Sequence, residues 1–293
     1  MPVPAPRPFP IGLRGAVLAA IGLCGVWAFV ALGLSSEDIL PGADDWRVIG
    51  GFFAHALLPA MTYASPPGDP EAPAFLVLVG ESLWLTIAFA ATAVSLAVVL
   101  GVVLGFLGSQ AWWIGDPAGA ASPWVAILRR TVAPALYGST RVVIALMRSV
   151  HELIWAVVLL AALGLSDLSA VIAIAIPFGG TLAKIFSEMI DEAPRDASRA
   201  LREAGASGAQ VFVFGLLPRA LPDMGAYALY RFECALRSAA VLGFFGWRTI
   251  GYHVRQSWGE LHFGEVWTYL YALMALVLLV EWWSGALRRR FVA

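Results

Sequence analysis

Long runs of apolar residues, separated by shorter polar segments, dominate this chain. A helix needs about 20 predominantly apolar residues to cross the hydrocarbon core of a bilayer. The pattern therefore predicts an all-α, polytopic membrane helical bundle with six transmembrane helices. We expect these helices at Ala16–Leu34, Ser82–Leu107, Tyr137–Leu163, Leu168–Ile190, Met224–Gly246 and Val266–Leu287.

The composition supports a membrane protein and excludes several other classes. Of the 293 residues, 60% are hydrophobic and only 13% are charged, whereas soluble domains carry about 25% charged residues. The net charge of −1 gives no reason to expect nucleic acid as a partner. Cys24 and Cys234 both lie in apolar stretches and form no disulfide or metal-binding pattern.

The arginines between the predicted spans indicate the orientation of the chain. Cytoplasmic loops of membrane proteins are enriched in Lys and Arg. If the N-terminus is cytoplasmic, Arg47, Arg248 and Arg255 are the only arginines in external segments. The cytoplasmic segments then hold Arg7, Arg14, Arg129, Arg130, Arg195, Arg199, Arg202, Arg219, Arg288, Arg289 and Arg290. We therefore expect a bacterial inner membrane protein whose two termini both lie in the cytoplasm.

This topology suggests two regions. Residues 1–74 would form an N-terminal cytoplasmic tail, the first transmembrane helix and an acidic external loop. Residues 75–293 would form the core domain, which contains a long polar cytoplasmic loop at 191–222.

The polar loop Asp191–Pro222 is predicted to form a helical hairpin. Asp191 and Glu192 precede a proline, an arrangement that favours the first turn of a helix. Gly205 is expected to end that helix, because glycine is the usual residue after a helix C-terminus.

Ser207 and Gln210 have the spacing of a capping box and would begin a second helix, which Pro218 would end. That helix places Val211, Phe212 and Phe214 near the apex of the hairpin. An apolar-faced element of this kind either docks a partner, lies on the bilayer surface or packs against its own helices.

The loop resembles the coupling loop of ABC importer permeases, whose pattern is Glu-Ala-Ala, three residues, Gly, nine residues, Ile, one residue, Leu-Pro. Gly205 is followed at the required distance by Leu217-Pro218, whereas Arg199 occupies the glutamate position and Gly215 the isoleucine position. The residues that the resemblance assigns to ATPase coupling are Asp196, Ala200, Gly205, Ala206, Ser207, Leu217 and Pro218.

Three further segments look like the phosphonate-type family of these permeases. They are Arg148–Ala156, Tyr227–Glu233 and Arg237–Gly243, and the resemblance extends over roughly residues 137–285. One segment departs from the family, which usually has a glycine-rich stretch after the fifth span. Here the stretch Gly246–Gly251 contains bulky residues, Trp247 among them.

The resemblance implies a type I importer-like permease fold and a division of labour between subunits. A homodimer of this chain would form the path, two copies of an ABC ATPase would dock on the coupling loops, and a periplasmic or extracellular substrate-binding protein would deliver the substrate. The chain contains no Gly-Lys dipeptide and so no phosphate loop. The chain would therefore bind no cofactor and no metal, and ATP and Mg²⁺ would be held by the ATPase.

Phosphonate or a related phosphorus oxyanion is the implied substrate, and phosphite, hypophosphite and phosphate remain alternatives. A polytopic membrane enzyme is a further alternative, but the four histidines are scattered along the sequence. A passive channel or an ion-coupled carrier would have no use for a docking loop.

Charged residues inside the predicted spans form a second set of candidates. Arg148 and Glu152 are four residues apart, as are Glu233 and Arg237, so each pair is expected to share a helix face. Charges at membrane depth normally face a cavity or one another. The two pairs would therefore interlock as ion pairs between two spans, or Arg148 or Arg237 would give the translocation path a positive potential for an anion.

Overall fold

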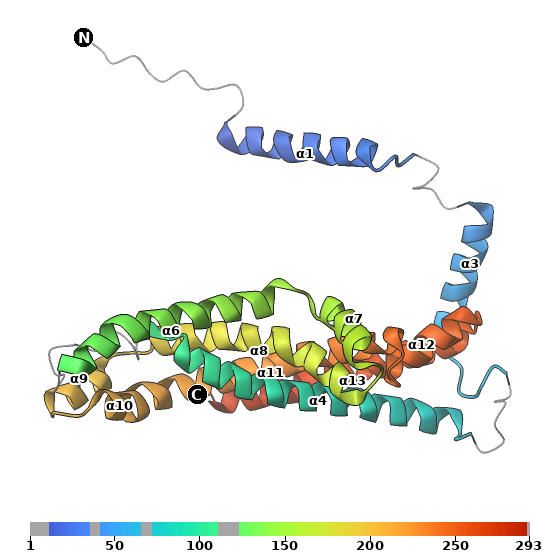
Figure 1. The fold of residues 1–293 in the computed structure, drawn as a ribbon. Helices are drawn as coiled ribbons and strands as arrows, with labels where there is room; N and C mark the ends of the chain where they lie inside the picture. The colour runs from blue at the N-terminus through green and yellow to red at the C-terminus, as the bar shows by residue number, and fades with distance from the viewer. Residues whose placement is uncertain (1–11, 36–41, 66–71, 111–122, 292–293) are drawn as a thin grey trace, which may run out of the picture. The chain divides into compact units, whose positions relative to one another are not determined.

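The computed structural model describes residues 12–35, 42–65, 72–110 and 123–291, and within these ranges every regular element is a helix (Figure 1). The chain divides into two compact units at Leu57. The first unit contains α1 (Leu13–Ala31), α3 (Ala43–Ala54) and the short helix His55–Leu57. The position of α1 confirms the first predicted span.

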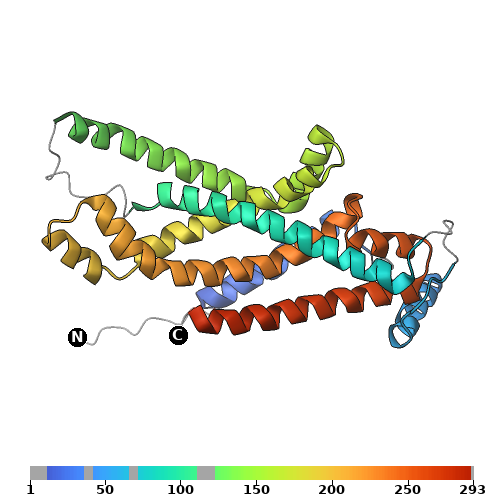
Figure 2. The same ribbon diagram turned by 90° about the horizontal axis from the view of Figure 1, so that it is seen from below.

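The second unit, Leu58–Ala293, is a bundle of long helices. The long helices are α4 (Phe75–Leu107), α6 (Pro123–Ser149), α7 (Glu152–Leu163), α8 (Asp167–Glu192), α11 (Leu217–Leu242) and α13 (Phe263–Phe291). The short helices α9 (Asp196–Glu203) and α10 (Gly208–Val211) lie at one end of this bundle, and α12 (Ile250–Gly259) lies at the other (Figures 1 and 2).

Four described helices, α1, α4, α8 and α13, are long and apolar enough to cross a membrane, and α6 with α7 makes a fifth if the bent pair is one span. The chain is therefore multi-pass, as predicted. The expected fifth span, Met224–Gly246, is the exception. This segment is helical, as part of α11. However, α11 contains too many charged residues to count among the helices that are apolar enough to cross a membrane.

The span predicted at Tyr137–Leu163 is wrong as a single helix. The chain breaks after Ser149, and α6 and α7 meet at 91°. His151 is extended there and caps α7, because its Nδ1 accepts a hydrogen bond from the Leu153 backbone N–H at 3.3 Å. The segment contains neither proline nor glycine at the break, so no ordinary breaker marked it in the sequence.

The core of the second unit lies around α8, whose buried residues contact α4 most extensively. Two glycines of α4 allow the close approach. A Cβ atom added at Gly101 would lie 2.6 Å from the Cβ of Leu182, and one added at Gly105 would lie 3.0 Å from the Cβ of Phe186. Close backbone approach through small residues is the usual way in which membrane helices pack.

We expect Gly101→Val to destabilise the bundle by about 1–3 kcal/mol, the usual effect of overpacking a close contact. Gly80→Val is a matched control on the same helix, because a Cβ atom there meets nothing within 4 Å. Thermal unfolding of the purified protein in detergent would show a lower Tm for the first variant only. Equal Tm values for both variants would contradict this account of the α4–α8 contact.

The segment Leu58–Ser65 is attached to the opposite end of the bundle from α9 and α10 through Glu265. This buried carboxylate accepts hydrogen bonds from the Ala64 N–H and from the Ser257 hydroxyl, both at 2.7 Å. The Ala60 N–H also bonds the Gly264 carbonyl oxygen at 3.0 Å. The turn between α12 and α13 is therefore fixed to the segment that leads into α4.

Candidate functional site

The hairpin begins later than the sequence suggested. We expected Asp191 in the first turn of its first helix, but Asp191 belongs to the last turn of α8. There its carboxylate accepts hydrogen bonds from the Ser109 hydroxyl at 2.7 Å and from the Gln110 N–H at 3.1 Å. Asp191 therefore ties the end of α4 to the end of α8 and fixes the base of the hairpin, and α9 starts only at Asp196.

The turn at Gly205 is confirmed. Gly205 has φ +84°, the left-handed conformation that favours glycine. The N–H of Ala206 bonds the Leu201 carbonyl oxygen at 2.9 Å, and the N–H of Gly205 bonds the Arg202 carbonyl oxygen at 3.0 Å. These two bonds define a Schellman motif, which satisfies the last carbonyl groups of α9 and reverses the chain.

The second half of the hairpin starts as predicted but ends differently. The capping box is confirmed, since the Ser207 N–H bonds the Gln210 side-chain oxygen at 2.8 Å and the Gln210 N–H bonds the Ser207 hydroxyl at 3.4 Å. Pro218, however, does not end the helix. A π-helical turn, Phe212–Leu216, leads directly into α11, and Pro218 lies in the first turn of α11, where proline is tolerated. The hairpin is therefore continuous with α11.

Gly215 lets the two arms of the hairpin pack together. A Cβ atom added at this position would lie 3.0 Å from the Ser198 hydroxyl oxygen and 3.2 Å from a methyl carbon of Leu201. Ser198 is buried in α9. The family pattern has isoleucine here, and the close contact with α9 explains why this chain has glycine instead.

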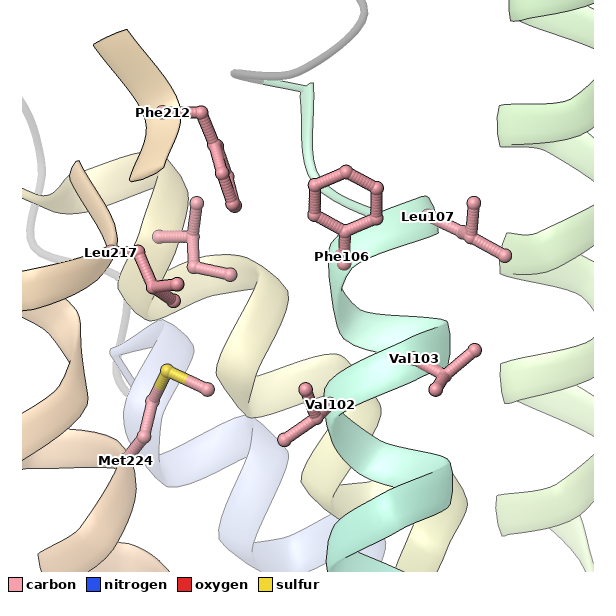
Figure 3. Close-up of a pocket in the computed structure, with 8 residues that line it drawn as sticks. Val102, Val103, Phe106, Leu107, Phe212, Leu217 and Met224 are labelled. Atoms are coloured by element: carbon pink, nitrogen blue, oxygen red, sulfur yellow. The ribbon is translucent and has the colours of Figure 1, made fainter. Parts of the chain in front are cut away.

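An apolar groove of about 300 Å³ lies behind the π-helical turn (Figure 3). It is lined by Val102, Val103, Phe106, Leu107, Ile190, Phe212, Leu217 and Met224. The rings of Phe106 and Phe212 meet edge to face across it, with centroids 4.9 Å apart. Of the three apolar residues predicted near the apex, Val211 and Phe212 are buried, and the side chain of Phe214 is 70% exposed.

Most of the candidate coupling residues are accessible on the hairpin, while Leu217 also lines the apolar groove. Asp196, Ala200, Gly205, Ser207 and Pro218 are exposed, and Ala206 and Leu217 are partly exposed. The hairpin thus presents an accessible turn whose base is anchored to α4 and α8.

The intramembrane charges are arranged differently from the expected helical pairs. Arg148 lies in the last turn of α6 and Glu152 begins α7, so the break places them on different helices. Glu152 instead accepts a hydrogen bond from the Ser238 hydroxyl on α11 at 2.8 Å, and His151 Nε2 lies 3.4 Å from its other carboxylate oxygen. Arg148 and Glu152 therefore do not share one helix face as predicted, and Glu152 connects α7 to α11 through Ser238.

Glu233 pairs with an arginine outside the predicted set. Its carboxylate, with 8% of the side chain exposed, lies 3.0 Å from Nη2 of Arg288 on α13. Arg237 donates to the sulfur of Cys234 at 3.8 Å. In the described part of the chain, no carboxylate lies within ion-pair distance of Arg148 or Arg237, and both side chains are exposed. Sequence reasoning counted Arg288 as a terminal charge and missed this pair.

The atypical segment after α11 turns its large side chain inward. Trp247 is only 3% exposed, and its indole N–H donates to the Ser166 carbonyl oxygen at 2.8 Å. Gly246 before it has φ +116°. The bulky residue therefore fixes the turn after α11 to the N-terminus of α8 and is not held at the surface.

Comparison with characterised families supports a transport role for this architecture. Residues 124–292 match the family described as the inner membrane component of binding-protein-dependent transport systems. This match covers α6 through α13, including the hairpin and all four intramembrane candidates.

Several curated proteins are similar to the chain. A phosphite transport system permease protein of Stutzerimonas stutzeri is 37% identical over 161 residues, covering 54% of this chain and 58% of that protein. A phosphate-import permease protein of Mycolicibacterium smegmatis is 32% identical over 203 residues, covering 69% of this chain and 36% of that protein. A cryptic phosphonate transport system permease protein of Escherichia coli K12, described as putative, is 29% identical over 113 residues, covering 39% of this chain and 93% of that protein. The chain thus spans about a third to three fifths of the length of the first two relatives.

Solved structures share the fold. The MetNI methionine ABC transporter, in inward-facing conformations, matches with a TM-score of 0.59 at 20% identity, covering 74% of this chain and 97% of the matched one. An amino acid ABC transporter gives a TM-score of 0.59 at 15% identity, covering 74% and 95%. The type I importer-like permease fold is confirmed. The chain belongs to the family of inner membrane components of binding-protein-dependent transport systems, the permeases of ABC importers.

Proposed function

We propose that this chain is the transmembrane subunit of an ABC importer that translocates phosphonate or a related phosphorus oxyanion by alternating access. The observation that supports this mechanism is the unbroken connection between the hairpin and α11. Because α11 also contacts α7 through Ser238 and α13 through Glu233, a displacement of the hairpin would reach three helices at once.

In this proposal a separate ATPase supplies the energy. Two ATPase copies dock on the hairpins of a homodimer and contact Asp196, Ala200, Gly205, Ala206, Ser207, Leu217 and Pro218. ATP and Mg²⁺ are bound by the ATPase and no cofactor by this chain. A binding protein delivers the anion on the external side, and both termini lie in the cytoplasm, as the arginine distribution favours.

The charges at membrane depth have different roles in the proposal. Glu152 and Glu233 have partners on other helices and hold the spans together. Arg148 and Arg237 have no carboxylate partner in the described chain, so their charge is available to the path, where it favours an anion. The names of the relatives, which refer to phosphite, phosphate and phosphonate, agree with an anionic substrate.

Reconstitution tests this function directly. Proteoliposomes containing this chain, its cognate ATPase and its binding protein should take up phosphite, phosphate or methylphosphonate when ATP is enclosed with the ATPase. Omitting the ATPase should stop uptake. If none of these anions is carried and a neutral solute is carried instead, the proposal is wrong.

A further inference from the structure

Two more arginines in the bundle share one local arrangement. Arg141 on α6 and Arg231 on α11 each follow a tyrosine by four residues, so each pair lies on one helix face. In both pairs the Nε–H of the arginine donates to the tyrosine hydroxyl at 3.2 Å. The guanidinium carbon lies 5.4 Å from the ring centroid of Tyr137 in one pair and 5.5 Å from that of Tyr227 in the other.

This arrangement leaves the same edge of each guanidinium available. The tyrosine takes only the Nε–H, and both Nη groups of Arg141 and Arg231 are without a hydrogen bond to any residue that the structure describes. Neither arginine has a carboxylate at ion-pair distance in the same part of the chain. The free Nη edge is the geometry that binds an oxyanion through parallel N–H···O bonds.

Tyr137 adds a further donor. Its hydroxyl oxygen accepts from Arg141 and from the side-chain amide of Gln110, the latter at 3.1 Å. Because the oxygen is used as an acceptor in both bonds, the hydroxyl hydrogen remains available to donate to an anion.

The positions of Arg231 and Arg148 along the bundle can be compared through their contacts with α8. The guanidinium of Arg231 lies 5.4 Å from the ring centroid of Phe178, and a Cβ atom at Gly180 would lie 3.0 Å from Cγ of Arg148. Phe178 and Gly180 are two residues apart, so Arg231 and Arg148 reach nearly the same level of α8 from different helices and on different faces of α8.

The other two arginines lie on either side of that level. Arg141 precedes Arg148 by two helical turns, about 10 Å nearer the hairpin end of α6. Arg237 follows Arg231 by nearly two turns, about 9 Å farther from the hairpin end of α11. The four arginines are therefore attached at staggered heights along the bundle, two on α6 and two on α11, and both helices start from the hairpin end (Figures 1 and 2).

We propose that Arg141 and Arg231 are further anion-contact residues of the path to which Arg148 and Arg237 contribute charge, and that Tyr137 and Tyr227 are positioning residues that aim their Nη edges. This inference rests on the proposed function. A cation beside aromatic rings also stabilises a fold, but that role alone does not depend on the charge of the substrate. The strength of a contact with the anion does depend on the charge of the substrate, because a dianion binds the guanidinium more strongly than a monoanion.

The test uses the complete reconstituted transporter. Phosphite, phosphate and methylphosphonate each change from a monoanion to a dianion near neutral pH, and the anion that wild type carries best serves as the probe. Uptake is measured at mildly acidic and mildly alkaline pH and divided by the wild-type rate at the same pH. Arg231→Gln should reduce uptake by about tenfold at alkaline pH, the loss of a charge-assisted hydrogen bond, and by less at acidic pH.

Conservative variants and a control sharpen the result. Arg231→Lys should recover part of the uptake, and Tyr227→Phe should show a smaller loss with the same pH trend. Arg141→Gln and Tyr137→Phe should behave in parallel. Arg289→Gln, which removes an exposed charge at the end of α13, should match wild type.

Two outcomes overturn the inference while the proposed function stands. In one, wild type carries the anion and Arg231→Gln and Arg141→Gln carry it at the same rate. In the other, these variants lose uptake equally at both pH values together with a lower Tm, which identifies the tyrosine–arginine pairs as structural anchors. If wild type itself carries no phosphorus oxyanion, the proposed function fails first, and the two failures are thereby distinguished.

Discussion

Replacing Gly205 with valine is expected to reduce ATP-dependent uptake at least tenfold while the chain still inserts and folds. No atom lies within 4 Å of a Cβ at this position, so space is not the constraint. The constraint is the backbone, because φ +84° is unfavourable for a β-branched residue by more than about 1–2 kcal/mol. Relaxing that strain would break the Schellman bonds to Leu201 and Arg202 and reorient α9.

Gly205→Asn is the matched control for this prediction. Asparagine tolerates the left-handed conformation better than other non-glycine residues. The asparagine variant should therefore keep most of the uptake, although it also adds a side chain at this position. Co-purification with the ATPase and uptake in proteoliposomes would be measured for both variants. A valine variant that binds the ATPase and transports at the wild-type rate would show that the Gly205 turn is not needed for coupling.

Glu233→Ala is expected to destabilise the protein by about 3 kcal/mol. Removing one partner of a buried ion pair leaves the other charge without compensation, which costs about 3–5 kcal/mol. The lower end applies because the side chain of Arg288 keeps 28% of its surface exposed. The measurement is the Tm of the detergent-purified protein.

A double variant separates the ion pair from general packing. Glu233→Leu combined with Arg288→Leu should recover much of the stability lost in Glu233→Ala, since neither charge is then left alone at membrane depth. Arg237→Ala serves as the comparison on the same helix, because Arg237 has no carboxylate partner in the described chain and its loss should leave the Tm nearly unchanged. If Arg237→Ala lowers the Tm as much as Glu233→Ala does, the Glu233–Arg288 pair has no special structural role.

The hairpin shows which local features could be read from the sequence. Its turn at Gly205 and its capping box at Ser207 depend only on residues close to one another in the sequence, and both were predicted correctly. The residues at which the hairpin begins and ends were not predicted correctly. The contact of Asp191 with Ser109 and Gln110 extends α8 beyond the predicted start of the hairpin, and these partners are about 80 positions away in the chain.

The intramembrane charged residues likewise include features that the sequence predicted and features that it did not. Spacing of four residues correctly placed Glu233 and Arg237 on one helix, α11, but it could not show that Glu233 faces inward to Arg288. The pair at Arg148 and Glu152 failed for a different reason. The capping bond of His151 breaks the helix between them, and a histidine before a glutamate is a weak signal of a helix start.

The sequence by itself determined the membrane class, most of the spans, the helical hairpin and the resemblance to importer permeases, because hydropathy, glycine and capping signals act locally along the chain. Only the tertiary structure decided the break between α6 and α7, the joining of the hairpin to α11 and the partners of the intramembrane charges. The partners of the charges depend on side chains that are distant in the sequence and meet only when the helices pack around α8. The break and the continuous hairpin are local, but neither a histidine cap nor a proline in the first turn of α11 marks them clearly in the sequence.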